Sequence, residues 1–428
     1  MSNFINAEDM EEVRKNRIPG LDLPNDFITP AYHGQSILNI PASICRAFNL
    51  EPIHSVPLRY EIFPQIDTNI QRIIIILMDG LALSRFSSWL ENGKISIWNQ
   101  LLKSGSIAPI TSISPSTTSA AMTTLWTGHS PAEHGVMGYE MWLKQYGIVS
   151  NMISQAPMSF KSGHANLSQA GFDAETVLTT PKLGEHLVRN GVSTYSFQHY
   201  SIANSGLSRT FMNDIQIYPY SNEAECWVNM RELIDSKLHE KLYLWTYWSA
   251  LDNLGHRYGP DDERTVTYFE NFSRNLEYNL INQLTESQRK GTLLIFTSDH
   301  GQVTTPKNPI YSLTNHPEFI NNLHIKPTGE SRLTYLHVKP NKEETVRAYV
   351  EKTWPDQFVV FESSQLLAAG LFGHGTPHPD IHNRIGDLLV LAKNQKYLWW
   401  SEEENPLIWR HGGLTELDMI VPFVAISL

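Results

Sequence analysis

Short apolar runs that end at a polar residue are the feature that most constrains the fold of this chain. IIIILM is followed by Asp79, LYLWTYWSA lies just before Asp252, and TLLIFTS is followed by Asp299. Runs that are apolar throughout and rich in β-branched residues predict strands buried on both faces, as in parallel sheets. Because open α/β sheets bind ligands beyond the carboxyl ends of their strands, we expect these polar side chains to converge on one cleft.

Amphipathic stretches separate these runs. LSRFSSWLENG and IWNQLLKSG have helical spacing, and VPFVAISL closes the chain as a further strand. Alternation of helices and strands predicts an α/β fold, in which a large, mostly parallel sheet is covered by helices on both faces. We therefore expect a three-layer αβα sandwich.

The domain organisation is predicted from changes along the chain. Residues 1–65 are rich in Pro and Asn, with one short helix in SILNIPASICRAFNL, and are expected to wrap over the sheet. Residues 66–302 and 384–428 are expected to form the core, with IGDLLVLA as one of its strands. Residues 303–383 read as strand, helix and strand, which predicts a small α/β insertion. The length of 428 residues fits one large core with such elaborations.

Composition excludes several classes of protein. Charged residues make up 18% and hydrophobic residues 41%, which is typical of a soluble globular chain. A net charge of -11, without a run of five basic residues, argues against a dedicated nucleic-acid surface. The two cysteines lack CxxC spacing and exclude a disulfide scaffold. Without a signal-like segment or a membrane-length apolar stretch, we expect a cytoplasmic protein with no membrane contact.

A hydroxyl-rich segment precedes one predicted helix. In SPSTTSAAMTTLW, one of the residues from Ser116 to Ser119 is expected to cap the helix that begins near AAMTTLW. The N-terminus of a helix favours an anion, and a hydroxyl placed there could act as a nucleophile. A hydroxyl needs a base or a metal to activate it, and no base is adjacent in the sequence. A metal is therefore the expected activator.

Three further segments carry residues of the types that bind metals. LDNLGHRYGP places Asp252 and His256 four residues apart, but Gly255 and the following Gly-Pro lead us to expect a bent loop rather than a regular helix. SDHG supplies Asp299 and His300 at a strand end, where adjacent side chains point to opposite faces. HGGL near the end of the chain adds His411.

Together these segments supply three aspartates, three histidines and a hydroxyl, enough for two metal ions with three ligands each. A mixed nitrogen and oxygen set suits zinc and, less well, manganese or iron. Calcium or magnesium would not need imidazoles. The absence of cysteine ligands and the nearby hydroxyl favour a catalytic centre, with a metal-stabilised binding protein as the non-enzymatic alternative.

The order of these motifs resembles the alkaline phosphatase superfamily, and most closely its nucleotide pyrophosphatase/phosphodiesterase branch. The resemblance rests on MDG, a hydroxyl followed by TG, DNLGHRYGP, SDHG and a late HG, and covers about residues 70–302 and 384–422. It implies an alkaline phosphatase-like fold and two divalent ions. One would be held by Asp252, His256 and His411, and the other by Asp79, Asp299 and His300 with the Thr118 oxygen beside it. Thr118 matches the family's spacing of ten residues before Gly128, and Thr117 is the alternative nucleophile.

The resemblance also implies an activity and a substrate class. It predicts a phosphodiesterase or nucleotide pyrophosphatase that acts on a small phosphate ester or nucleotide through a covalent phosphothreonine. Where the family carries an Asn three residues after the nucleophile, this chain has Ala121, so a phosphomonoesterase or phosphonate hydrolase is the alternative. Ser119, Trp126 and His378 are further candidates for contacts with the substrate.

Overall fold

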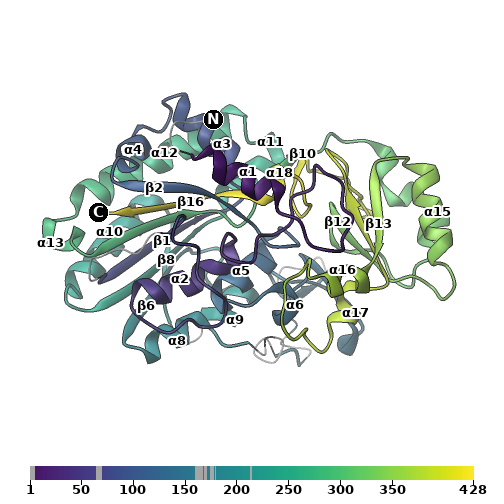
Figure 1. Cartoon of the computed structure of the whole chain (residues 1–428), viewed down its shortest axis with the longest axis horizontal. Coiled ribbons are helices and arrows are strands. Elements are labelled where there is room, and N and C mark those ends of the chain that lie inside the picture. The colour runs from purple at the N-terminus through teal and green to yellow at the C-terminus, as the bar shows by residue number, and fades with distance from the viewer. Residues whose placement is uncertain are drawn as a thin grey trace.

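The computed structural model describes residues 5–63, 70–159, 167, 171–173, 178, 180–212 and 215–428. A long seven-stranded sheet forms the larger part of the molecule (Figure 1). Its order is β2 (Gly105–Thr111), β16 (Ile420–Ser427), β9 (Thr292–Thr297), β1 (Arg72–Met78), β8 (Lys241–Trp248), β6 (Val192–His199) and β7 (Gln216–Tyr220). All neighbouring strands are parallel except at β16, which runs antiparallel to both β2 and β9. The mostly parallel sheet predicted from the sequence is confirmed.

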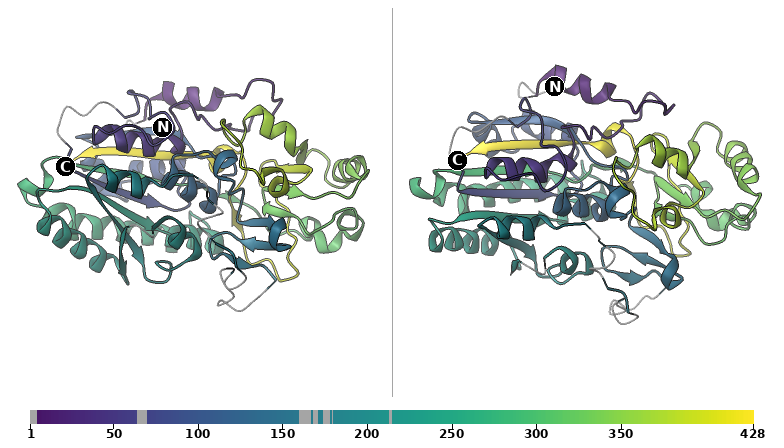
Figure 2. Two further views of the ribbon diagram at one scale, coloured as in Figure 1. Left: turned by 90° about the horizontal axis from the view of Figure 1, so that it is seen from below. Right: turned by 60° about the horizontal axis from the view of Figure 1, so that its bottom comes forward.

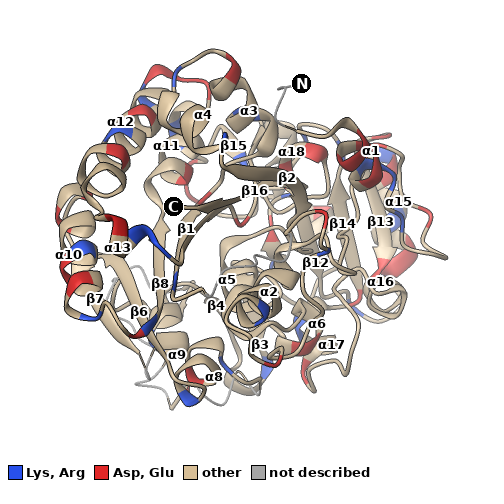
Figure 3. Ribbon diagram, turned by 60° about the vertical axis from the view of Figure 1, so that its left-hand side comes forward, with Lys and Arg blue, Asp and Glu red and all other residues tan. Residues whose placement is uncertain are grey.

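Helices cover both faces of this sheet, as the view along it in Figure 3 shows. One layer contains α3 (Leu83–Glu91), α4 (Ser96–Leu101), α10 (Glu223–Ser236), α11 (Ala250–Tyr258) and α12 (Glu263–Asn279). The other contains α2 (Ile40–Ala47), α5 (Thr118–Thr127), α8 (Leu183–Arg189) and α9 (Gly206–Met212). The predicted three-layer αβα arrangement is therefore confirmed.

The centre of the sheet is buried because its strands are apolar on both faces. Every residue of β1 is buried, and the β-branched run Ile73–Ile76 fits the pleated surface. Met78 is in register with Trp248 of β8, and Leu77 is in register with Thr297 of β9. The three strands therefore end at nearly the same level, so the residues that follow them leave the sheet from one edge.

A second, antiparallel sheet lies beyond that edge (Figure 1). Its order is β13 (Phe358–Glu362), β14 (Leu388–Ala392), β12 (Leu333–Leu336), β11 (Thr328–Glu330), β3 (Glu140–Leu143), β4 (Ile148–Asn151) and β5 (Ala156–Pro157). Helices α15 (Glu343–Thr353), α16 (Ser363–Ala369) and α17 (Ile381–Ile385) accompany it. The strand and helix pattern expected within residues 303–383 is thus present in this part of the structure.

One strand differs from its predicted place. The strand in IGDLLVLA, expected in the catalytic core, is β14 and pairs with β12 and β13 in the second sheet. Leu389 and Leu391 pack into the main core, whereas Leu388 and Val390 pack into a smaller core with α15. The strand is buried on both faces as its composition predicts, but between two different cores. Apart from this, the division into wrap, core and insertion remains a prediction.

The N-terminal segment contributes α1 (Ala7–Lys15), which lies outside the main sheet (Figure 2). Arg14 forms an ion pair with Glu416 at 2.7 Å, on α18 (Glu416–Met419). The Ile28 N–H donates to the Leu414 carbonyl at 2.7 Å. These contacts hold the first residues against the end of the chain. Among the described helices, none is both long enough and apolar enough to cross a bilayer.

Candidate metal centre

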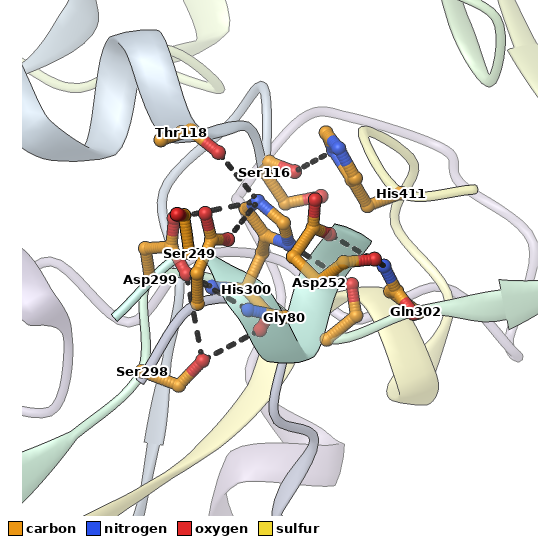
Figure 4. A network of polar contacts seen from close by, with 12 residues as sticks. Gly80, Ser116, Thr118, Ser249, Asp252, Ser298, Asp299, His300, Gln302 and His411 are labelled. Atoms are coloured by element: carbon orange, nitrogen blue, oxygen red, sulfur yellow. Dashed lines mark hydrogen bonds and ion pairs between the residues drawn. The ribbon is translucent and has the colours of Figure 1, made fainter. Parts of the chain in front are cut away.

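The polar residues that follow β1, β8 and β9 meet at the edge of the sheet, as Figure 4 shows for several of them. Asp79 follows β1 and is 2% exposed, and Asp299 and His300 follow β9 with no exposed surface. Gly80 adopts a positive φ of 76°, and a Cβ there would lie 2.9 Å from Oδ1 of Asp252. The Asp-Gly pair after β1 therefore allows the chain to turn while Asp252 approaches closely.

Asp252 and His256 lie on one turn of α11, so the expected bent loop is wrong. The helix continues through Gly255, where a Cβ would lie only 1.9 Å from Oε1 of Gln302. Glycine at this position makes room for Gln302, whose Nε2 donates to the Asp252 carbonyl at 3.0 Å and also to its carboxylate. The helix brings His256 Nε2 to 3.2 Å from Oδ2 of Asp252.

His411 joins this pair from the loop after β15 (Trp409–Arg410). Its ring stacks on that of His300, with a centroid distance of 3.8 Å. One potential ligand atom from each of Asp252, His256 and His411 lies within 4.8 Å of the others. The structure thus brings together the three residues that the resemblance assigns to one ion.

The second group differs in one member from the expected set. Asp79, Asp252 and His300 have ligand atoms within 4.8 Å of one another, so Asp252 is shared between the two groups. Asp299 remains adjacent, because His300 Nε2 lies 3.4 Å from Oδ2 of Asp299 and 3.4 Å from Oδ1 of Asp79. All six predicted ligands therefore converge, with Asp252 between the two groups.

The three imidazoles are oriented in the same way. Nδ1 of His256 contacts the Trp409 carbonyl at 2.7 Å, and Nδ1 of His300 contacts the Gly301 carbonyl at 3.0 Å. Nδ1 of His411 contacts the Ser116 carbonyl at 3.2 Å. Because a carbonyl only accepts, each Nδ1 carries a proton, and the neutral form of each ring has its lone pair on Nε2. Backbone bonds of this kind orient metal-binding histidines.

The carboxylates also fit a cation. Oδ1 of Asp79 and Oδ2 of Asp299 are buried and have no hydrogen-bond partner among the described residues. Both lie 3.4 Å from Nε2 of His300, so two carboxylate oxygens and an imidazole nitrogen face one space. Buried unpaired carboxylate oxygens are costly unless a cation or donor compensates them. A divalent ion would do so, and imidazole nitrogens together with carboxylate oxygens are a donor set that such ions accept.

Burial and mutual repulsion perturb the ionisation of these groups. Burial raises the pKa of Asp79 well above its usual value, and the charges of Asp299 and Asp252 add to the effect. Burial also opposes ionisation of Asp252, but the adjacent His256 outweighs it, so the pKa of Asp252 is lowered. Burial and the nearby His300 lower the pKa of His411 well below its usual value. A neutral His411 and an ionised Asp252 are the states that bind metal.

Thr118 is the first residue of α5, directly beside this cluster. Its Oγ1 lies 3.1 Å from Nε2 of His300, and Figure 4 shows it directed at that ring. Thr117, the alternative nucleophile, occupies the N-cap position in extended geometry without a side-chain cap bond, and its hydroxyl lies beside the Glu330 carboxyl. Burial raises the pKa of Glu330 to about 7. The geometry therefore favours Thr118, whose hydroxyl faces the candidate metal ligands.

The other predicted contacts lie in different surroundings. Ser119 is buried on α5, and its Oγ has no partner among the described residues. Trp126 is completely buried, packs on Trp245 with a centroid distance of 5.1 Å, and does not line the cavity next to Thr118. His378 is buried beside Gly135 and does not line the cavity next to Thr118. Ala121 has no exposed surface, and position 121 does not line that cavity either.

Sequence reasoning missed several polar residues around the candidate ligands. The Tyr247 hydroxyl donates to Oδ2 of Asp79, Gln302 holds Asp252, and Glu330 accepts the Tyr139 N–H at 2.7 Å. Tyr247 lies near the end of β8 and Gln302 lies two residues after His300. Their closeness in sequence to the candidate ligands could therefore have identified both residues. Glu330 ends β11 and Tyr139 directly precedes β3, so their contact depends on the pairing of these two strands in the second sheet, which the sequence did not reveal.

Comparison with known families agrees with these motifs. A sequence profile described as Type I phosphodiesterase / nucleotide pyrophosphatase matches residues 73–414. Among curated proteins, the chain is 23% identical over 299 residues to bis(5'-adenosyl)-triphosphatase enpp4 of Xenopus laevis. That match covers 67% of this chain and 59% of the relative, so it spans less than two thirds of the relative's length.

Solved structures share the fold. Murine ectonucleotide pyrophosphatase/phosphodiesterase 5 is similar with a TM-score of 0.61 at 18% identity, covering 83% of this chain and 88% of the other. A complex of an inactive variant of the same murine protein with AMP is similar with a TM-score of 0.60 at 17% identity, over the same shares of the two chains. Phosphonoacetate hydrolase from Sinorhizobium meliloti 1021, in complex with phosphonoformate, has a TM-score of 0.59 at 15% identity. That match covers 83% of this chain and 90% of the hydrolase.

Proposed function

Because the chain belongs to the type I phosphodiesterase/nucleotide pyrophosphatase family, we propose that it is a two-metal hydrolase of phosphate esters, most specifically phosphodiesters, with Thr118 as its nucleophile. The observation that carries this proposal is the 3.1 Å contact between Thr118 Oγ1 and His300 Nε2, within a cluster of six potential metal ligands. A hydroxyl at a helix N-terminus, facing such a cluster, is placed to attack an anionic phosphorus centre.

The residues supply distinct parts of a two-step reaction. Thr118 Oγ1 forms a bond to phosphorus and its hydroxyl proton passes to solvent, while the bond from phosphorus to the leaving oxygen breaks and the electron pair departs on that oxygen. A water oxygen then bonds to phosphorus, the bond from phosphorus to Thr118 Oγ1 breaks, and a proton from the water restores the hydroxyl. The N–H groups at the start of α5 favour the anionic phosphoryl group. Divalent ions, when bound, supply the positive charge that activates a hydroxyl and stabilises the transition state.

The proposed ions are two zinc ions, with manganese or iron as alternatives. Asp252, His256 and His411 would hold one ion. Asp79, His300 and Asp299 would hold the other, with Asp252 placed between the two. The orientation of all three Nε2 atoms and the unpartnered oxygens of Asp79 and Asp299 support this assignment.

Nucleotides are one candidate substrate class, since one relative is a bis(5'-adenosyl)-triphosphatase and one similar structure is a complex with AMP. Monoesters and phosphonates are the second class. The observation that favours them is Ala121, which cannot supply the amide that the resemblance expects. In either class the substrate is a small molecule.

The test is hydrolysis of bis-p-nitrophenyl phosphate by protein loaded with zinc or manganese. The same preparation is assayed with p-nitrophenyl phosphate and p-nitrophenyl phenylphosphonate, and kcat/KM values are compared. We expect the diester to be preferred. Acid quenching during turnover should trap a nitrophenylphosphoryl group on the peptide that contains Thr118, detected by mass spectrometry.

Variants separate the nucleophile from its neighbours. Thr118→Ala should lower kcat by roughly 10³-fold or more while bound metal is retained. Thr117→Ala should have a much smaller effect. Thr127→Ala, on the last turn of α5 with its hydroxyl bonded to the Thr123 carbonyl, is the matched control. Full turnover in Thr118→Ala would contradict the assignment of Thr118 as the nucleophile. If metal-loaded protein hydrolysed none of the esters, the non-enzymatic alternative, a metal-stabilised binding protein, would be favoured.

A further inference from the structure

A small cavity opens directly beside Thr118. Its volume is about 50 Å³, and it lies between α5, α9 and the carboxyl ends of β6 and β8. Thr118 and Tyr247 both line it. Most of its wall is apolar, contributed by Met122, Ile202, Leu207, Phe211 and Met212. A substrate that reaches Thr118 therefore places one of its groups against an apolar surface.

The position of the cavity identifies the group that enters it. In phosphoryl transfer, the attacking and leaving oxygens lie in line on opposite sides of phosphorus. A leaving group therefore points away from Thr118. A cavity with the nucleophile in its wall is placed for a substituent that stays on phosphorus during the first step.

The charge of the cavity restricts this substituent. None of the described residues that line it is charged. A carboxylate placed there would lose its water without gaining a cation as partner, which is costly. An uncharged group would avoid this cost, and an apolar one would gain from contact with Met122 and Phe211.

One polar side chain in the wall is Gln198, at the end of β6. Its Oε1 accepts from the Ser208 hydroxyl at 3.0 Å, which fixes the orientation of the amide. Its Nε2 donates to the Met212 sulfur at 2.9 Å, and a thioether is a weak acceptor. A carbonyl or ether oxygen on the substrate would be a stronger acceptor for this amide.

The volume also restricts size. A cavity of about 50 Å³ has room for only a few water-sized groups. A chain of three or four carbon atoms fits this space, whereas a purine ring does not fit entirely. A nucleoside would have to place its base elsewhere.

We propose that this cavity is a specificity pocket for the ester group retained on phosphorus, and that this group is short, uncharged and mainly apolar. The proposal rests on the proposed function, with Thr118 as nucleophile. It distinguishes the chain from a diesterase whose retained ester group carries a carboxylate. Gln198 is the residue that would select a carbonyl or ether oxygen within the group.

The test uses p-nitrophenyl alkyl phosphates that share one leaving group and differ in the retained group. Methyl, butyl, 4-oxopentyl and 3-carboxypropyl esters are compared by kcat/KM on zinc-loaded protein. We expect the butyl ester to exceed the methyl ester by about 10-fold or more. The 4-oxopentyl ester should exceed the 3-carboxypropyl ester, which has nearly the same size, by at least about 10-fold.

Variants locate the effect. Ile202 is half-buried in the cavity wall, and Ile202→Lys should shift the ratio of 3-carboxypropyl to 4-oxopentyl turnover toward the carboxylate by about 10-fold. Ile310→Lys, at an exposed isoleucine beside the second sheet, should leave that ratio unchanged. Gln198→Leu should lower the 4-oxopentyl rate relative to the butyl rate.

The outcomes separate this inference from the proposed function. Equal kcat/KM values for the methyl and butyl esters would contradict the proposed specificity pocket but not the proposed hydrolase activity. A preference of the wild-type protein for the 3-carboxypropyl ester over the 4-oxopentyl ester would do the same. Failure to cleave any ester in the series, or bis-p-nitrophenyl phosphate, would overturn the proposed function and the inference with it.

Discussion

Tyr247 donates its phenolic hydrogen to Oδ2 of Asp79, across the parallel pair β8 and β1. The contact leaves Oδ1 of Asp79 as the oxygen that faces His300. Strand β8 contains no candidate metal ligand, but its Tyr247 orients Asp79, the candidate ligand that follows the neighbouring strand β1. Hydrogen bonds to ligands of this kind typically affect metal affinity and activity.

Replacing Tyr247 tests this orientation. We expect Tyr247→Phe to lower activity or metal affinity by roughly 10 to 100-fold, because Asp79 loses the donor that fixes its second oxygen. Metal titration and kcat measured at saturating zinc check the effect. Tyr243→Phe is the matched control, since the Tyr243 hydroxyl on the same strand is buried with no partner among the described residues. Equal losses in the two variants would contradict a specific role for Tyr247.

Metal stoichiometry tests the shared position of Asp252. Because Asp252 belongs to both groups of potential ligands, Asp252→Asn should reduce bound metal from about two ions per chain toward none. His411→Gln should remove only about one, because His411 belongs to a single group. Elemental analysis after dialysis against buffered zinc measures both. Loss of one ion in each variant would instead place Asp252 in one site alone.

Removal of metal should lower stability as well as activity. Binding of an ion at 100 times its Kd stabilises the folded state by about 2.7 kcal/mol per site. Chelation should therefore lower Tm by several degrees, and zinc should restore it. The same treatment of Asp252→Asn should change Tm much less. An unchanged Tm in the wild-type protein would show that the cluster does not hold ions in the folded chain.

Gly255 tests the packing that orients Asp252. A Cβ at this position would lie 1.9 Å from Oε1 of Gln302, so Gly255→Ala should displace the side chain that holds Asp252. Alanine normally stabilises a helix relative to glycine by about 1 kcal/mol, so a loss of metal affinity would come from this clash. We expect roughly 10-fold weaker zinc binding. Adding Gln302→Ala to Gly255→Ala should cause little further loss, because the first change already removes the contact.

The pH dependence of stability should report on Glu140. Burial raises the pKa of Glu140 from 4.5 to about 7, and its Oε2 accepts from Nε1 of Trp400 at 2.9 Å. The folded chain therefore holds this proton more tightly than the unfolded chain. Ionisation of the Glu140 carboxyl is therefore unfavourable in the folded state. The resulting decrease in the free energy of unfolding grows from about pH 4.5 to about pH 7 and is constant above that pH.

Glu140→Gln removes that loss and keeps an acceptor for Trp400. The variant should be more stable than the wild type by about 2 to 3 kcal/mol at pH 8, from the size of the pKa shift, and by less than about 1 kcal/mol at pH 5. Urea unfolding at the two pH values measures the difference. Glu362→Gln, at an exposed glutamate on β13, should show no such dependence. A difference that grows toward low pH would contradict the sign.

Local patterns in the sequence were enough to predict the central sheet and its ligand positions. IIIILM and TLLIFTS are apolar throughout, which only a buried central strand accommodates, and each is followed at once by Asp79 or Asp299. Their order along the chain also indicated the family, since motif order does not depend on packing. The sheet to which β14 belongs could not be predicted in this way. The apolar composition of β14 shows that both of its faces are buried, but not which residues cover them.

The supporting contacts could not be predicted for a related reason. Gly255 suggested an interruption of the helix around Asp252 and His256. In the structure the helix continues, and the absence of a side chain at Gly255 leaves room for Gln302, which lies just after β9. Trp126 suggested a pocket wall, but its ring packs in the core on Trp245. A residue type indicates which interactions are available, and only its neighbours decide which one forms.

The sequence by itself determined the fold class, the family and the inventory of candidate ligands, because these depend on residue types and spacing along the chain. The tertiary structure decided that Asp252 lies between both ligand groups, that Thr118 rather than Thr117 faces His300, and that an uncharged cavity lies beside it. These features depend on distances of a few ångströms between segments hundreds of residues apart, which are set by how the strands, helices and second sheet pack.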